Sequence, residues 1–124
     1  MVRGPTHTVV ETPAFTRTAK RVGLGKAETD ALLDLLMTEP GSGELIVGGG
    51  GIQKVRLAKE ETGKSGGYRV LTFYMDDGAP AYLLAIIDKT EVDNISADQK
   101  KQLKTLAKAI KDERDRKDGR TGAR

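Results

Sequence analysis

Two cationic side chains stand two residues apart near the middle of the chain. Lys54 and Arg56 alternate with Val55 and Leu57 in the run GGIQKVRLA. In an extended strand this spacing puts both cations on one face, about 7 Å apart, and turns the apolar pair toward a core. An arginine can hold a phosphate through two hydrogen bonds, and a lysine beside it is a candidate proton acceptor. The pair therefore indicates chemistry on a phosphodiester, although an ordinary solvated strand face has the same pattern.

A third cation opens the next apolar run, SGGYRVLTFY, which predicts a second strand. Alternation puts Arg69 on the side of Leu71 and Phe73, unless the preceding glycines bulge the backbone and turn its side chain. We predict that Arg69 joins Lys54 and Arg56 at one phosphate. A structural arginine folded over the sheet edge is the alternative.

Three more residues are candidate contacts to the substrate around these cations. Lys64 lies in the loop between the two strands, Tyr68 could stack on a base, and Lys89 follows the last predicted strand. The loop itself, AKEETGKS, fits a permissive nucleotide-binding pattern. That pattern needs a helix directly after the loop to hold the phosphates, and here a strand follows, so we do not expect nucleotide hydrolysis.

The rest of the sequence predicts the elements that position these side chains. We expect an edge strand at 7–11, a helix that begins at Thr12 and Pro13, a helix at 27–38, strands near 52–58, 68–76 and 81–88, and a last helix opened by Ser96 and Gln99. Asp77 and Gly78 are typical of a tight hairpin. The fold class is therefore α+β, a small antiparallel sheet with two N-terminal helices and a C-terminal helix. Residues 7–110 form one domain, and 111–124 are a flexible, charged tail.

Composition narrows the classes of function. The chain has 124 residues, a net charge of +3, one histidine and no cysteine. These counts exclude disulfides and thiolate metal sites, and we expect neither a metal nor a cofactor. Residues 52–74 carry five lysines and arginines against two glutamates, so 5 − 2 = +3 falls in this segment alone. Without a signal peptide or a long apolar segment, we expect a cytoplasmic protein that does not contact a membrane.

Three stretches carry a family resemblance: GGIQKVRLA, GKSGGYRV and LLAIIDKTEVDNIS, in this order and after two helices. With them the chain resembles the RelE/ParE superfamily of bacterial type II toxin–antitoxin toxins, most closely its HigB-like branch. The resemblance covers about residues 7–110. It implies the RelE-like microbial RNase fold and a ribosome-dependent endonuclease that cuts messenger RNA in the decoding site and so inhibits translation.

The resemblance also implies roles for single residues. In such enzymes the messenger's 2′-hydroxyl attacks the adjacent phosphate without a metal and leaves a 2′,3′-cyclic phosphate. Lys54 matches a candidate base, Arg56 a transition-state clamp, Arg69 the arginine that steadies the scissile phosphate, and Lys89 a basic position after the last strand. No tyrosine or histidine follows Tyr82, where several relatives carry one. We therefore expect charge stabilisation and positioning to dominate.

The partners that the resemblance implies are a cognate antitoxin of the helix-turn-helix type and a ribosome with messenger in its decoding site. Operator DNA would be contacted only through the antitoxin. Two other functions compete with this one: a non-catalytic toxin that binds DNA gyrase, and a general nucleic-acid-binding protein. The three cations favour the nuclease, since a gyrase binder needs no phosphate clamp.

Overall fold

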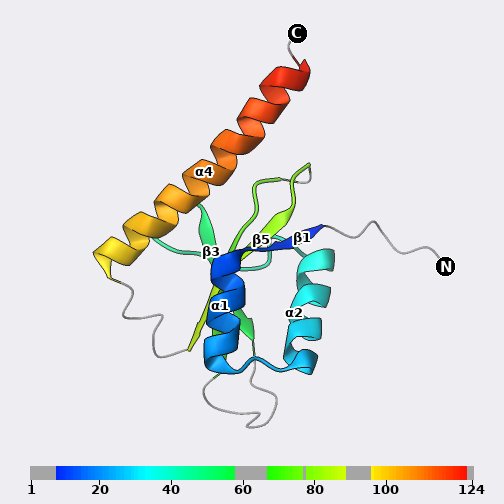
Figure 1. The fold of residues 1–124 in the computed structure, drawn as a ribbon, viewed down its shortest axis with the longest axis vertical. Helices are drawn as coiled ribbons and strands as arrows, with labels where there is room; N and C mark the ends of the chain where they lie inside the picture. Colours follow the sequence, from blue (N-terminus) through cyan, green and yellow to red (C-terminus); the bar gives the residue numbers. More distant parts are fainter. Residues whose placement is uncertain (1–7, 58–66, 77, 89–95, 123–124) are drawn as a thin grey trace, which may run out of the picture.

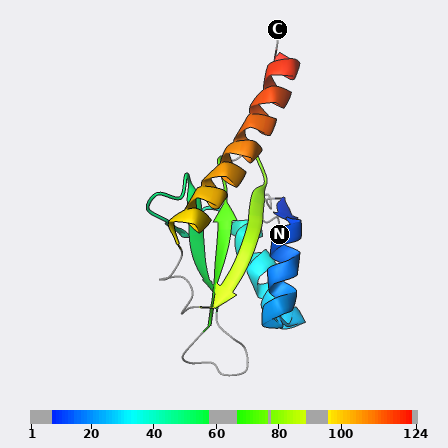
Figure 2. The ribbon, with the colours of Figure 1, turned by 60° about the vertical axis from the view of Figure 1, so that its left-hand side comes forward.

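A five-stranded sheet lies between helices on both of its faces in a computed structural model of the chain (Figures 1 and 2), which describes residues 8–57, 67–76, 78–88 and 96–122. The strands are β1 (Val9–Glu11), β2 (Glu44–Leu45), β3 (Ile52–Leu57), β4 (Tyr68–Phe73) and β5 (Ala81–Asp88). The helices are α1 (Pro13–Val22), α2 (Lys26–Thr38) and α4 (Ala97–Gly122). The predicted α+β class is confirmed.

The strand order is β1-β5-β4-β3-β2. The prediction that the last three strands are antiparallel is confirmed for β3, β4 and β5. The edge strand β1 pairs parallel to β5, so the sheet as a whole is mixed rather than antiparallel. A turn does close near the predicted position, where the Ala79 N–H donates to the Asp76 carbonyl at 3.1 Å. The connection is longer than a tight hairpin, because β4 ends at Phe73 and β5 begins only at Ala81; Asp77 lies outside the described residues.

A β-bulge interrupts the pairing of β4 with β5. Leu71 faces Ala85 and Thr72 faces Leu83, which leaves Leu84 as an extra residue on β5. Such a residue shifts the alternation of a strand by one position. Leu84 and Ala85 consequently pack in the same apolar cluster, although they are neighbours in sequence.

Each face of the sheet has its own apolar core. The first cluster joins the sheet to α1 and α2 through Phe15, Leu32, Leu36, Val55, Leu57, Tyr68, Val70, Leu83 and Ile86. The second joins it to α4 through Ile52, Leu71, Phe73, Leu84 and Ala107. Figure 2 shows α4 on one side of the sheet and α1 on the other. Strand β5 is thus covered by apolar side chains on both faces, which explains its nearly continuous apolar sequence.

Helix α1 begins as predicted and also protects the edge of β5. The Thr12 hydroxyl oxygen accepts a hydrogen bond from the Phe15 backbone N–H (3.3 Å) and donates one to the Leu83 carbonyl (2.8 Å). Beyond the end of β1, the Thr18 hydroxyl oxygen accepts the backbone N–H of Ile86 at 3.0 Å. Because an unpaired strand edge exposes hydrogen-bonding groups, these threonines replace a missing strand.

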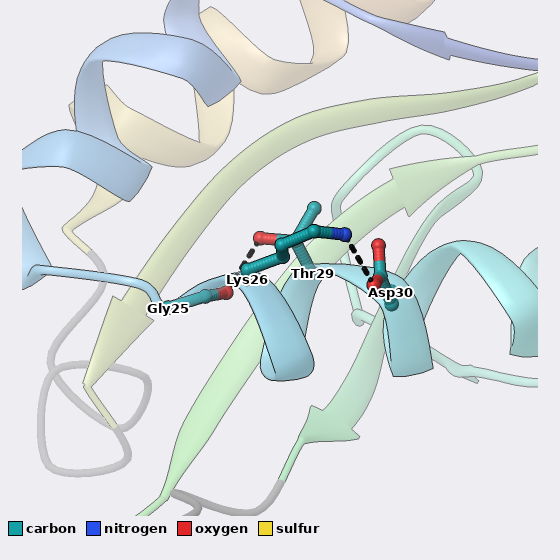
Figure 3. Close-up of polar contacts among 4 residues, drawn as sticks. All are labelled: Gly25, Lys26, Thr29 and Asp30. Carbon is teal, nitrogen blue, oxygen red and sulfur yellow. Dashed lines mark hydrogen bonds and ion pairs between the residues drawn. The ribbon is translucent and has the colours of Figure 1, made fainter.

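The second helix begins at Lys26, one residue before the predicted start. Figure 3 shows its first turn, where the Thr29 hydroxyl donates to the Gly25 carbonyl (2.9 Å) and Lys26 pairs with Asp30 (2.9 Å). The Gly25 N–H donates to the Glu28 carboxylate at 2.9 Å, which satisfies one more donor of the helix start.

Helix α4 opens with the predicted capping box: the Ser96 N–H donates to Gln99 Oε1 (2.9 Å), and the Gln99 N–H donates to Ser96 Oγ (3.1 Å). The backbone stays helical to Gly122, past the residue 110 at which we ended the domain, and this part of α4 projects beyond the sheet (Figure 1). Whether 111–124 are flexible stays a prediction. Within the described ranges, no helix is long and apolar enough to cross a bilayer.

We predict that Thr18→Val lowers the free energy of unfolding by about 1–3 kcal/mol, because it leaves the Ile86 N–H without its acceptor. Urea unfolding measures the change. Thr16→Val is the matched control. The Thr16 side chain is exposed, and its hydroxyl donates to the carbonyl of Thr12, the N-cap of α1 (3.4 Å), rather than to a strand. Equal stability of both variants would contradict this account of the β5 edge.

A second prediction concerns the ion pair that joins α4 to the β4–β5 connection. Arg114 lies 2.8 Å from Asp76, and its hydrogen bond, followed by that of the Gly78 N–H, holds the Asp76 pKa below its ordinary value of 3.8. Because the folded pKa is the lower one, the pair stabilises the fold above about pH 3.8 and is lost as the pH falls through the folded value.

Carboxyl ¹³C NMR should therefore give Asp76 a titration midpoint below 3.8. Arg114→Gln should move this midpoint upward, toward the ordinary value. Lys108→Gln, on the same helix but paired with Asp112, should leave it unchanged. An unchanged Asp76 midpoint in Arg114→Gln would show that Arg114 does not lower the pKa of Asp76.

Candidate functional site

The three predicted cations lie on one face of the sheet. Arg56 of β3 stands directly opposite Arg69 of β4, and Lys54 stands opposite Leu71. Directly paired residues share a face, and Leu71 belongs to the cluster under α4. The cations therefore occupy the α4 side, and Arg69 keeps the side that simple alternation predicts.

Helix α4 leaves this end of the face accessible. The apolar pair Ile52–Phe73 marks the opposite end of β3 and β4, and both of its members are buried in the α4 cluster. Arg56 is exposed, whereas Arg69 is half-buried and donates a hydrogen bond to the Tyr68 carbonyl (3.2 Å). Two like charges directly opposite each other destabilise a sheet, and an anion bound between them would remove that cost.

A glutamate that the sequence did not suggest lies beside Lys54. Glu44 of β2 pairs with Lys54, and its Oε1 is 4.0 Å from Nζ. Gly43 permits this pairing, since a Cβ there would lie 2.8 Å from the Lys54 carbonyl oxygen. Lys54 thus has a carboxylate neighbour as well as a cationic one. The register of the short edge strand decides this contact, and no local sequence signal specifies that register.

Of the three further contacts that the sequence suggested, only Tyr68 is among the described residues, and it is not part of this group. Tyr68 is 6% exposed and packs in the core beneath α1, where its hydroxyl donates to the Val22 carbonyl at 3.5 Å. In this position its ring cannot stack on a base, which corrects the predicted role. Lys64 and Lys89 lie outside the described residues.

A cavity of about 580 Å³ lies between α1, β5 and α4 and reaches β4 at Leu71, but none of the three cations lines it. Its floor includes Leu71, Ala85 and Ile87, and Ile87 stands directly opposite Arg69. Arg21 and Gln102 contribute polar groups to its lining. Sequence reasoning missed Arg21, because only the packing of α1 beside β5 brings it near β4.

The chemistry that this arrangement supports is electrostatic. Two guanidinium groups and an ammonium group supply charge and hydrogen-bond donors to an anion, as phosphate chemistry requires. Among the residues that the structure describes, no three histidine, aspartate or glutamate side chains gather where they could hold a metal ion.

Comparison with known proteins identifies the family to which the chain belongs. Residues 8–118 match the family described as the RelE toxin of the RelE/RelB toxin–antitoxin system. Among solved structures, the chain is similar to a double arginine-to-alanine mutant of the Escherichia coli toxin RelE in the free state. The sequence identity is 19% and the TM-score 0.48, over 72% of this chain and 88% of that one.

Because Arg56 and Arg69 face each other, we predict that they lower the stability of the free protein while they favour binding of an anion. Arg56→Gln should raise the free energy of unfolding of the isolated protein by about 0.2–1 kcal/mol at low salt, because it removes a like-charge pair. The gain should shrink as salt screens the charges. Urea unfolding at two salt concentrations measures it, with Arg17→Gln on α1 as the control for net charge. A loss of stability in Arg56→Gln alone would show that the two arginines do not repel each other.

Proposed function

This chain belongs to the RelE family of toxins of toxin–antitoxin systems, and from this premise we propose how its cations act on messenger RNA. The family makes it a toxin that inhibits translation as an mRNA interferase. We place the cut at the phosphate that Arg56 and Arg69 hold. The observation that carries this proposal is the direct pairing of the two arginines at the open end of the sheet face under α4.

Arg56 and Arg69 stabilise the negative charge that develops on the phosphate during cleavage. Cross-strand partners have Cβ atoms about 4.5–5.5 Å apart, close enough for two guanidinium groups to contact the same phosphate. Arg69 is half-buried and hydrogen-bonded to the Tyr68 carbonyl (3.2 Å), so its guanidinium is held in place before the substrate binds, whereas the Arg56 side chain is exposed. Preorganised donors of this kind lower the barrier without reorganising during the reaction.

Lys54 acts on the attacking group. In its neutral amine form Lys54 accepts the proton of the messenger's 2′-hydroxyl, whose oxygen then attacks the adjacent phosphorus, and the bond to the 5′-oxygen breaks. The products are a 2′,3′-cyclic phosphate and a 5′-hydroxyl, the latter taking a proton from solvent, and no metal takes part. The Glu44 carboxylate, 4.0 Å from Nζ, orients the lysine across the β2–β3 pair.

The finer assignments follow from the resemblance alone. We place the chain in the HigB-like branch, with a helix-turn-helix antitoxin that mediates any contact with operator DNA. Action on ribosomes places it in the cytoplasm. These assignments do not depend on the geometry of the cations.

Arg69→Ala should lower the cleavage rate of ribosome-bound messenger about 10²–10³-fold, the usual cost of one preorganised donor to a developing charge. Primer extension on messenger from a purified translation reaction locates the cuts and gives their rate. Arg17→Ala, an exposed arginine on α1, is the control for loss of one charge.

Cleavage by Arg69→Ala at the wild-type rate would refute the assigned role. Cuts that appear equally on messenger without ribosomes would refute ribosome dependence. Intact messenger together with DNA damage after expression in cells would instead identify a gyrase-directed toxin.

A further inference from the structure

A row of lysines runs along one side of α4. Its members follow one another at steps of three, four and three residues, which places them on one face of a helix. They are Lys101, Lys104, Lys108 and Lys111, and all four are exposed. At a rise of 1.5 Å per residue the row is about 15 Å long.

The row borders a groove of about 470 Å³ beside the turn between β2 and β3, where Gly50, Thr105 and Asp112 complete the lining. Gly50 has a φ of 70°, and a Cβ there would lie 3.0 Å from Cγ of Lys104. The turn therefore packs directly against the lysine stem. This contact fixes the row relative to the sheet that carries Arg56 and Arg69.

Among the described residues, a single ion pair engages the charges of the row. Lys108 pairs with Asp112 at 2.9 Å, whereas Lys101, Lys104 and Lys111 have no ion pair among the described residues. Like charges three or four residues apart destabilise a helix. The row thus lowers the stability of α4, and an anionic partner would offset this cost.

The lining of the groove indicates the kind of anion. It includes no aromatic and no large apolar side chain, although protein partners bind mainly through such anchors and single-stranded nucleic acids through aromatic stacking. Lysines are point charges that contact phosphates without reading bases. A regular row of them fits the sugar–phosphate backbone of a nucleic-acid double helix.

We infer that the lysine row of α4 docks the protein on the backbone of double-helical RNA, apart from the phosphate held by Arg56 and Arg69. That the double helix is RNA, and that this RNA is ribosomal, rests on the proposed function, whereas binding of a sugar–phosphate duplex by the row does not. The row positions the toxin, and the sheet cuts the messenger.

The test compares two triple variants with the same loss of charge. K101Q/K104Q/K111Q removes the three lysines without an ion pair, and R17Q/K20Q/K26Q removes three exposed cations from α1 and α2. Each is titrated with a blunt RNA duplex of about 16 base pairs and with ribosomes lacking messenger, at about 50 and 200 mM salt. Circular dichroism and thermal unfolding verify that both variants are folded.

The row variant should bind both probes roughly 100-fold more weakly at the lower salt, and its log–log salt slope should be less steep by about 3, one unit per lost phosphate contact. The control variant should bind like the wild type. Equal losses in both variants, or none in the row variant, would overturn the inference.

Arg69→Ala separates the inference from the proposed function. It should keep ribosome binding while the cleavage rate falls about 10²–10³-fold. If the wild-type protein binds the duplex through the row but neither binds ribosomes nor cuts messenger, the docking surface stands and the proposed function fails. If Arg69→Ala abolishes binding as the row variant does, the two surfaces are not separate and the inference fails.

Discussion

The antiparallel register between β3 and β4 is the constraint on which the rest of the molecule depends. Val55 and Val70 face each other in the core beneath α1 and α2, while Ile52 and Phe73 face each other beneath α4. A slip of one residue would move every side chain of a strand to the other face. Burial on both sides therefore fixes the register, and the register brings Arg56 opposite Arg69.

Helix α4 determines how much of this sheet face is open to a ligand. It covers one end of the sheet face, where Ala107 packs on the buried apolar pairs, and it is tied to the β4–β5 connection by Arg114 and Asp76. It leaves the arginine end uncovered and carries its own row of lysines along the β2–β3 turn. One helix thus completes a core, limits the site and adds a second cationic surface.

The starts of α1 and α4 were predictable because they depend on local chemistry, whereas the end of α4 at Gly122 was not predicted. Thr12 with Pro13, and Ser96 with Gln99, cap helices through hydrogen bonds within four residues. The three central strands were equally predictable, from the alternation of apolar and polar residues along the sequence. The length of the β4–β5 connection was not, since it depends on where the two strands stop pairing, and neither was the parallel pairing of β1, which joins residues about 70 positions apart in the chain.

For the site, the sequence by itself determined that Lys54 and Arg56 share a strand face and that Arg69 begins the next strand, because strand periodicity is a local property. Only the tertiary structure decided that this face is the one beneath α4, that Tyr68 turns into the opposite core, and that Glu44 stands beside Lys54. These outcomes depend on which apolar surface each helix buries and on the pairing of a two-residue edge strand. Both are set by packing between distant segments, and no short stretch of sequence contains that information.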